Sequence, residues 1–517
     1  MSVISPTRNK FRTADEAVLL IKDRDTVVLT GGGGGLVEPT HVFKAVERRF
    51  LSSASPRDLT VCHALGLGDK KSNGMNCWAY EGLVRRVIGG HWVWSPRMQE
   101  MAREEKIEAY ALPSGCVMQL YREIAGRRPG LFTHVGLGTF FDPRHGGGKL
   151  NASAQEDLVD VIEIGGKEWL WYKSFPVNVA IIRGSYGDAD GNISLDQEAA
   201  NVDIFAAALA AHNSGGLVIA QVRTAVDVNS MPARSVRVPG AIVDVVVVDP
   251  DQRMSYDLAY DPTMSGELRG PVAREPQESL DARAIIARRA YQELREGAII
   301  NFGVGIGEGV AKILADRGET ERFYQTIEHG TYGGSLLVGL LFGFARNPSA
   351  MIDAPSQFDF YGGGGLDIAF LGFGEVDRLG NVNVSKLGGN PVGPGGFLDI
   401  AQNAKKVVFC GTFDTAGTRL RIDNDGLTLE EPGRIRKLVG SVGQITYSGR
   451  EALKLGHQAI FVTERAVFEL TEEGLLLREI APGVDLQRDV LDQMGFAPLI
   501  PTTPKRMDRE LFRQPGA

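Results

Sequence analysis

One carboxylate, Glu328, lies between an apolar run and a loop that is rich in glycine. The segment TIEHGTYGG (326–334) contains it, with three glycines in the six residues that follow. The apolar run has the character of a strand, and in open α/β sheets ligands bind at the carboxyl ends of the strands. A solvated surface acid is the alternative, but such an acid needs no glycines to clear space around it. We therefore expect Glu328 to face a ligand.

A second glycine-dense loop has the spacing of an anion-binding turn. Gly303, Gly305 and Gly307 follow a predicted strand and open a predicted helix, and in this geometry backbone N–H groups hold phosphate. A dinucleotide-binding interpretation stays open, because Glu328 follows this loop at about the distance expected of a ribose-binding acid. A plain strand–helix turn is the other alternative.

A third glycine turn lies in NPVGPGGFLDIAQNAKK (390–406), ahead of a predicted helix and strand. Gly395 and Gly396 carry no Cβ, so they could present unshielded N–H groups to an oxyanion. A tight turn broken by Pro394 is the alternative interpretation. The sequence thus offers two backbone sites for negative charge besides the single acid.

The composition sets the class of protein around these residues. With 517 residues the chain is too long for one hydrophobic core, which predicts two domains. A net charge of −8 argues against nucleic acid as the main partner. No run approaches the ~18–20 apolar residues of a membrane span, and the N-terminus does not resemble a signal peptide. We expect a cytoplasmic protein with no membrane partner, whose four separated cysteines are reduced and structural.

The segments between these turns are predicted to alternate between strands and helices, which indicates a parallel α/β architecture. The chain also repeats itself: residues 177–193 align without gaps on 366–382, and the strand and glycines of 27–35 echo 299–307. The clearest strands are 27–30, 179–182, 217–222, 241–248, 298–301 and 407–410, and the expected helices are 38–50, 199–212 and 279–296.

The repeat predicts two similar, duplicated open α/β domains with mainly parallel sheets and an active site in the cleft between them. We expect the first domain at residues 1–265 and the second at 281–517. Between them, residues 266–280 are rich in proline and charge and are expected to form a linker.

Several long segments together resemble the family I coenzyme A transferases, in particular the single-chain acetate/propionate type. The resemblance runs over most of the chain and also includes the Glu-x-Gly-x-x-Gly-Gly form of 328–334. It implies an enzyme that moves coenzyme A (CoA) from a short-chain acyl-CoA to a free carboxylate such as acetate or propionate. The matching segments are FTHVGLGTFFDPRHGGGKLN (132–151), GKEWLWYKSFPVNVAIIRGSYGDADGNIS (166–194), NSGGLVIAQV (213–222), PSQFDFYGGGGLDIAFLGFGEVDRLGNVNVSK (355–386) and GGFLDIAQNAKKVVFCGTF (395–413).

The resemblance implies a role for the acid and for each glycine turn. Glu328 is implied to be the nucleophile of a ping-pong reaction, which becomes a glutamyl-CoA thioester. Gly395 or Gly396 is implied to donate an N–H to the oxyanion, and the loop 303–307 is implied to lie against CoA. A carboxylate suits this exchange because it needs no general base when it is ionised at neutral pH.

Other residues depart from the family pattern and bear on acyl specificity. Ser114 stands where many relatives carry glutamine, and we assign it to the substrate side. Asn381 and Asn383 are candidates for the acyl side, although asparagines also cap turns. His329 and Tyr332 differ from the small residues expected beside the nucleophile, and His329 is expected to pack or to form hydrogen bonds.

We expect acyl-CoA and a carboxylate as small-molecule partners, CoA as a substrate rather than a tightly bound cofactor, and no metal, since the eight histidines are scattered. Relatives of this kind are usually homo-oligomers, so a dimer or tetramer is expected. An acyl-CoA hydrolase or a 3-oxoacid CoA-transferase on the same scaffold stays open as an alternative. So do a nicotinamide dehydrogenase and a non-catalytic CoA-binding protein.

Overall fold

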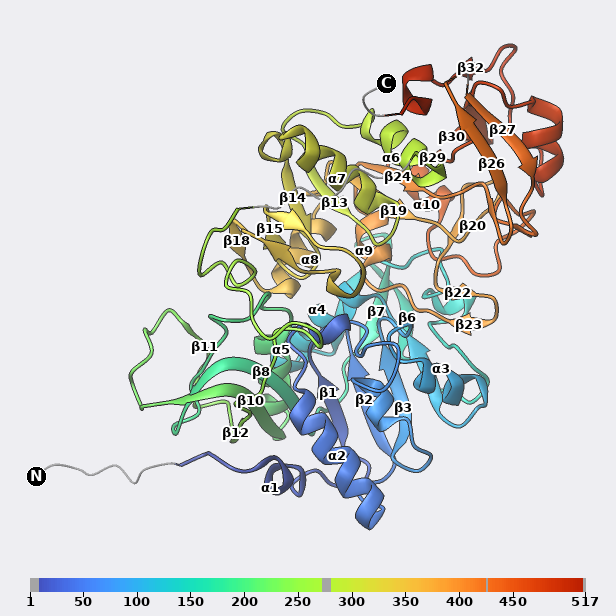
Figure 1. The fold of residues 1–517 in the computed structure, drawn as a ribbon. Coiled ribbons are helices and arrows are strands. Elements are labelled where there is room, and N and C mark those ends of the chain that lie inside the picture. Colours follow the sequence, from blue (N-terminus) through green and yellow to red (C-terminus); the bar gives the residue numbers. More distant parts are fainter. Residues whose placement is uncertain (1–8, 272–279, 425, 515–517) are drawn as a thin grey trace, which may run out of the picture.

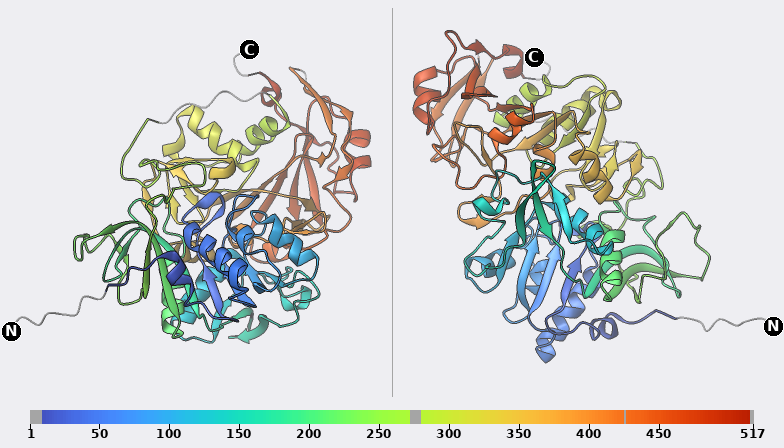
Figure 2. Two further views of the ribbon diagram at one scale, coloured as in Figure 1. Left: turned by 60° about the horizontal axis from the view of Figure 1, so that its bottom comes forward. Right: turned by 180° about the vertical axis from the view of Figure 1, so that it is seen from behind.

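A computed structural model describes residues 9–271, 280–424 and 426–514, which form two α/β halves (Figure 1). We call residues 9–265 the first half, blue to green in Figure 1, and residues 281–514 the second half, yellow-green to red. The halves lie side by side in both views of Figure 2. Most of the predicted linker, residues 272–279, lies outside the described part, as do residues 1–8. The domain boundaries therefore stay a prediction.

Seven parallel strands form the sheet of the first half, in the order β12-β10-β8-β1-β2-β3-β4. Two short strands, β9 and β11, continue from β8 in antiparallel pairs. The apolar runs of the seven parallel strands are buried, as expected for parallel strands that are covered on both faces. The strand bounds are β1 Thr26–Leu29, β2 Leu59–His63, β3 Val84–Gly89, β4 Glu108–Ala111, β8 Val179–Asp188, β9 Ile193–Ser194, β10 Leu217–Val226, β11 Val236–Val238 and β12 Val245–Val248.

The sheet of the second half repeats this plan. Its parallel strands β14-β13-β19-β24-β29 stand in the order of β2-β1-β8-β10-β12, and further strands extend both edges. The bounds are β13 Ile299–Phe302, β14 Tyr324–Ile327, β15 Thr331–Tyr332, β18 Ala350–Met351, β19 Ile368–Gly372, β24 Lys406–Cys410, β29 Gln458–Val462, β30 Ala466–Thr471, β31 Gly474–Ile480 and β32 Lys505–Arg506.

The duplication extends to single hydrogen bonds. After β8, Asn192 donates its N–H and its Nδ2 to the carboxylate of Asp188, at 3.0 and 2.9 Å. After β19, Asn381 makes the same two bonds to Asp377, at 3.1 and 3.0 Å. Two duplicated, mainly parallel α/β units are therefore confirmed.

The helices connect the strands, and no helix among the described residues is long and apolar enough to cross a membrane. Their bounds are α1 Ala14–Val18, α2 Thr40–Ser53, α3 Pro96–Arg103, α4 Ser114–Ala125, α5 Ile204–Asn213, α6 Ala282–Tyr291, α7 Gly307–Arg317, α8 Ala354–Gly362, α9 Phe397–Ala401 and α10 Gly449–Lys454. An antiparallel sheet in the first half joins β5 Gly130–Thr133, β6 Val159–Ile164 and β7 Lys167–Lys173. The remaining strands, all in short hairpins or pairs, are β16 Ser335–Leu336, β17 Ala345–Arg346, β20 Glu375–Val376, β21 Val382–Asn383, β22 Lys386–Leu387, β23 Asn390–Pro391, β25 Asp414–Thr415, β26 Arg419–Asp423, β27 Gly426–Glu431 and β28 Ile435–Arg436.

Predicted and observed elements differ mainly at their ends. The helix expected from 279 begins after Asp281, because that side chain caps it by accepting the N–H of Ala284 at 2.9 Å. The strand expected over 241–248 is reduced to β12, because its first residues lie in a turn in which the N–H of Ile242 bonds to the carbonyl of Pro239 at 2.9 Å. A capping side chain explains the first difference and a turn explains the second.

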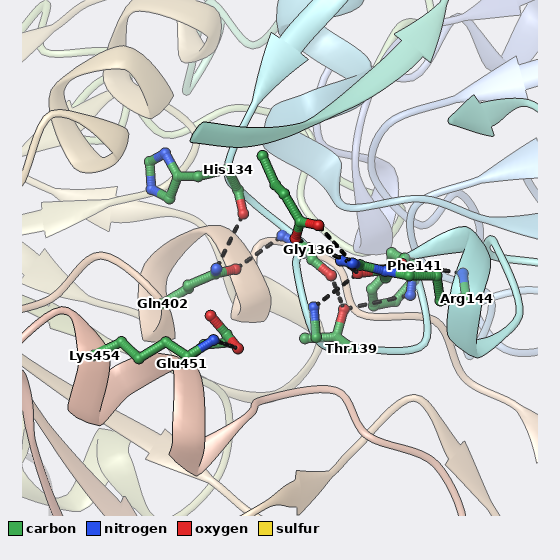
Figure 3. Close-up of polar contacts among 11 residues, drawn as sticks. His134, Gly136, Thr139, Phe141, Arg144, Gln402, Glu451 and Lys454 are labelled. Atoms are coloured by element: carbon green, nitrogen blue, oxygen red, sulfur yellow. Dashed lines mark hydrogen bonds and ion pairs between the residues drawn. The ribbon is translucent and has the colours of Figure 1, made fainter. Parts of the chain in front are cut away.

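Polar contacts fasten the two halves to each other (Figure 3). Gln402 of the second half accepts the N–H of Gly136 at 2.8 Å and donates to the carbonyl of His134 at 3.1 Å. The loop of the first half that contains Gly136 and Gly138 also packs on α10. Gly138 lies so close to α10 that a Cβ added to it would come within 2.8 Å of the Glu451 side chain. The halves therefore meet in a defined arrangement rather than across a loose gap.

Candidate active site

A cavity of about 320 Å³ lies between the two halves. Its second-half lining follows the ends of β13, β14 and β19, so it lies at the carboxyl edge of the sheet, where α/β proteins bind ligands. The first half contributes Gly33, Leu65, Gly66, His91 and Trp94. The second half contributes Gly303, Val304, Glu328, His329, Phe342, Leu371, Gly372, Phe373, Gly374, Val384, Leu387, Val392, Gly393, Pro394, Gly395, Gly396, Phe397 and Ile400.

Glu328 is the residue that follows β14, and its carboxyl group reaches this cavity. Only 16% of the side chain is exposed. The nearest ion-pair contact joins its Oε1 to Nε2 of His329 at 3.8 Å. Burial raises the pKa of Glu328 to about 7, so the group is about half protonated at neutral pH, whereas full ionisation was expected.

His329 is a packing residue, as predicted. Its ring is buried and its Nδ1 lies 3.3 Å from the carbonyl of Gly343. Burial lowers the pKa of His329 to about 4, which keeps the ring neutral. The histidine therefore adds no positive charge beside Glu328.

The glycines after Glu328 leave room for the chain itself, which corrects the expectation that they clear space for a ligand. A Cβ on Gly330 would come within 2.1 Å of the carbonyl oxygen of Ile352. On Gly334 it would come within 2.3 Å of the carbonyl oxygen of Arg346. Both glycines also have positive φ: Gly330 lies in the tight return from β14 to β15, and Gly334 lies in the turn from β15 to β16.

Gly395 and Gly396 differ in what their N–H groups do. The N–H of Gly395 is already bonded to the carbonyl of Gly90 at 2.8 Å. The N–H of Gly396 has no acceptor among the described residues. A Cβ on Gly396 would lie 2.7 Å from Oε2 of Glu328, so this backbone stands directly against the carboxyl group. Gly396 is therefore the better candidate donor.

The glycines of loop 303–307 divide between two cavities. Gly303 lines the cavity beside Glu328, whereas Gly305 lines a neighbouring cavity of about 510 Å³ beside α7. Gly307 lines neither, and a Cβ there would come within 2.6 Å of the carbonyl oxygen of Phe370. Gly307 thus lets α7 pack closely on β19, and the exposed Val304 stands between the cavities.

Ser114, Asn381 and Asn383 do not line the cavity. Ser114 is fully buried and donates its hydroxyl to the carbonyl of Ala64 at 2.6 Å, although its own N–H meets the carbonyl of Gly395. Asn381 forms the turn described above, and Asn383 donates to Glu375 at 2.8 Å. These contacts favour the turn-capping alternative for both asparagines; their assignment to the acyl side stays a prediction.

No lysine or arginine is among the described residues that line the cavity. Its two histidines, His91 and His329, are kept neutral because burial lowers the pKa of each to about 4. The remaining wall is largely apolar, and Trp94 forms part of it: a Cβ on Gly33 or Gly66 would collide with that ring. Arginine and lysine line the neighbouring cavity instead, as Arg283, Lys312 and Arg346, together with the acids Glu308 and Asp316.

The sequence pointed to neither Trp94 nor Asp399, a buried acid three residues after Gly396. The available signals were the aromatic run HWVW (91–94) and the aspartate in GGFLD (395–399). Neither run has a helical or strand period, so only the folded arrangement brings them to the site. No group of three or more metal-ligating side chains was found among the described residues.

A family model described as coenzyme A transferase matches residues 11–249. Over 517 residues the chain is 41% identical to the acetate CoA-transferase YdiF of Escherichia coli K12, covering 99% of this chain and 97% of that one. The chain therefore belongs to the coenzyme A transferase family and is an enzyme of that class.

Two further relatives cover nearly the whole length. The caffeate CoA-transferase of Acetobacterium woodii is 42% identical over 514 residues, 98% of each chain. The apoenzyme structure of the acyl-CoA transferase YdiF from E. coli O157:H7 matches with a TM-score of 0.94 at 40% identity, covering 99% and 97% of the two chains. A structure of the same relative described as a thioester complex with CoA matches with a TM-score of 0.93, covering 98% and 96%.

Proposed function

We propose that this enzyme moves CoA from an acyl-CoA to a free monocarboxylate by a ping-pong reaction through a glutamyl-CoA thioester on Glu328. The observation that carries the proposal is the largely buried carboxyl group of Glu328 at the cavity, directly against the backbone of Gly396. The thioester complex of the relative YdiF with CoA supports it.

The first half-reaction needs the ionised form of Glu328. A carboxylate oxygen attacks the thioester carbonyl, which gives a mixed anhydride and CoA thiolate. The thiolate then attacks the glutamyl carbonyl, which releases the first acid as its carboxylate and leaves glutamyl-CoA. The acceptor carboxylate runs the same steps in reverse, so no net proton is taken up or released.

Each addition passes through a tetrahedral oxyanion that needs a donor already in place. The N–H of Gly396 is assigned this role, since it has no other acceptor among the described residues. One such donor is worth roughly 3–4 kcal/mol. Burial supports the attack as well, because a carboxylate with a raised pKa is a stronger nucleophile than one in water.

The charges of the two cavities support a placement for the two ends of the substrate. No lysine or arginine is among the described residues that line the cavity beside Glu328, so it suits an uncharged acyl group and the thioester. The neighbouring cavity has three cations, Arg283, Lys312 and Arg346, against two acids, Glu308 and Asp316, so it is the better of the two for the phosphates of CoA. A second carboxylate on the acyl group would meet no lysine or arginine in the lining beside Glu328, which is unfavourable. Acetate and propionate fit this class of acceptor.

A cytoplasmic location and a homodimeric or homotetrameric assembly are further proposals of the same kind. The location rests on the sequence expectations given above and the assembly on the family resemblance, rather than on any contact within the chain.

The covalent intermediate is directly testable. Incubation with acetyl-CoA alone should add the mass of CoA less one water to the intact enzyme, and borohydride should reduce the adduct to an alcohol in the peptide that contains Glu328. Glu328→Gln is the control and should acquire no adduct. Turnover without any adduct on this peptide contradicts the assignment. Release of acetate and free CoA without an acceptor, at the rate of transfer, would identify a hydrolase instead.

A further inference from the structure

Helix α4 of the first half begins without a capping side chain of its own. Its N-cap residue is Pro113, which makes no cap hydrogen bond, so the first N–H groups need acceptors from elsewhere. The second half supplies them. The carbonyl of Gly395 accepts the N–H of Ser114 at 2.9 Å, and Oδ2 of Asp399 accepts the N–H of Gly115 at 3.1 Å. Asp399 therefore caps a helix that belongs to the opposite half.

The same aspartate stands directly behind the Gly396 turn. It lies in the first turn of α9, three residues after Gly396, and it is 3% exposed. The ring of Phe358 links the two places: it contacts the position of a Cβ on Gly396 at 3.2 Å and on Gly115 at 2.5 Å. A displacement of Asp399 would therefore be passed to the turn beside Glu328.

Charge ties Asp399 to Glu328 as well. Burial raises the pKa of Asp399 to about 7, the Gly115 N–H opposes this, and the charge of Glu328 adds to it. Cys116 and Tyr172 are the other titratable groups facing it, and burial raises the pKa of both.

We propose that Asp399 is a positioning residue for the transfer reaction: by capping α4 across the cleft it fixes the Gly396 N–H against the carboxyl group of Glu328. This inference rests on the proposed glutamyl mechanism. Asp399 touches neither substrate nor the reacting atoms in this assignment; it acts through the turn that it fastens.

The test compares two substitutions at one position. Asp399→Ala removes the cap and should lower kcat about 10²-fold, since misplacement on the order of 1 Å has that effect on attack geometry. The KM for acetyl-CoA should stay within about three-fold. Asp399→Asn keeps an oxygen that can accept the Gly115 N–H, so it should restore kcat to within about ten-fold of the unchanged enzyme.

Asp359→Ala is the matched control. Asp359 also joins α4 to the second half, through Gln119 at 2.8 Å and Arg122 at 2.6 Å, but it does not line the cavity and its side chain is 49% exposed. Its removal should leave kcat within about two-fold. If Asp399→Ala does not fold, Gly115→Ala takes its place, because the added methyl group would enter within 2.4 Å of Asp399 Oδ1 and should produce the same loss.

Two outcomes overturn the proposal: a normal kcat without the cap, or a loss that asparagine does not restore. The rate of CoA addition to Glu328, followed by intact mass, separates this failure from that of the mechanism. An unchanged enzyme that never carries CoA contradicts the glutamyl mechanism. An Asp399→Ala variant that acquires CoA at the normal rate contradicts only the positioning role.

Discussion

Glu328→Gln should abolish transfer and at the same time stabilise the fold at alkaline pH. Burial raises the pKa of Glu328 to about 7 in the folded enzyme, against 4.5 for the free side chain. Between these values the native state binds more protons than the unfolded state, so stability falls as pH rises through this window. Well above pH 7, Glu328 is ionised in both states, and the loss in the free energy of unfolding reaches its full value of about 3 kcal/mol. Glutamine does not ionise, so it removes that cost.

The informative quantity is the pH dependence of the stability difference between the two proteins. A buried amide without partners has its own cost, but that cost does not change with pH. From pH 5 to pH 8.5 the variant should therefore gain about 2.5 kcal/mol over the unchanged enzyme. Asp399 acts in the same direction, because loss of the charge on Glu328 removes one cause of its raised pKa.

Equilibrium urea unfolding at half-unit steps between pH 5 and pH 8.5 measures this difference. Glu321→Gln is the control: it removes an exposed glutamate seven residues away and should change the free energy of unfolding by less than about 0.5 kcal/mol. A difference between Glu328→Gln and the unchanged enzyme that stays flat across this range would refute the claim that Glu328 is held in a desolvated site. The electrostatic part of the mechanism would then be wrong.

Two further predictions concern the turn and the acyl group. Gly396→Ala should lower kcat about 10²–10³-fold, because the methyl group would collide with Glu328 Oε2 and displace the oxyanion donor. Gly395→Ala should leave kcat within about five-fold. Equal losses of kcat at both positions in steady-state kinetics would contradict the assignment of the oxyanion donor to the Gly396 N–H. Butyryl-CoA should be used about 10²-fold or more better than succinyl-CoA in kcat/KM, since the cavity offers a second carboxylate no cation; equal values would show that the distal carboxylate finds a partner outside this cavity.

The strands and the duplication could be predicted because they depend on runs of residues that are adjacent in the sequence. Parallel strands covered on both faces read as continuous apolar runs, as in Val245–Val248, and a gap-free repeat indicates that the second half copies the first. The order of the strands in each sheet was not predicted, since it depends on pairing between distant segments. The helix starts could not be placed to the residue, since a single capping side chain such as Asp281 decides them.

Some features of the candidate site could likewise be predicted from the sequence, and others could not. Glu328 could be found because a lone acid after an apolar run is a local pattern. Its raised pKa could not, since desolvation depends on walls that come from both halves. The role of Asp399 could not be predicted for a similar reason. Its partner Gly115 lies in the other half, so the two residues meet only when the halves pack together. Gly330 was interpreted wrongly because a glycine records that space is needed and does not record which atoms fill it.

The duplication bears on why the proposed mechanism has one nucleophile, although the cleft lies between two similar halves. The carboxyl edges of the two sheets face the same cavity, so Gly33 after β1 and Gly303 after β13 line it together. The strand next to each should supply the reacting residue. After β14 that residue is Glu328, but after β2 it is Ala64, whose carbonyl accepts the Ser114 hydroxyl. A second acid there would place two like charges in one desolvated cavity, which would keep one of them protonated and unable to attack. The first half instead supplies part of the apolar wall and the helix α4 that Asp399 caps, so in the proposed mechanism only the second half provides a reacting side chain.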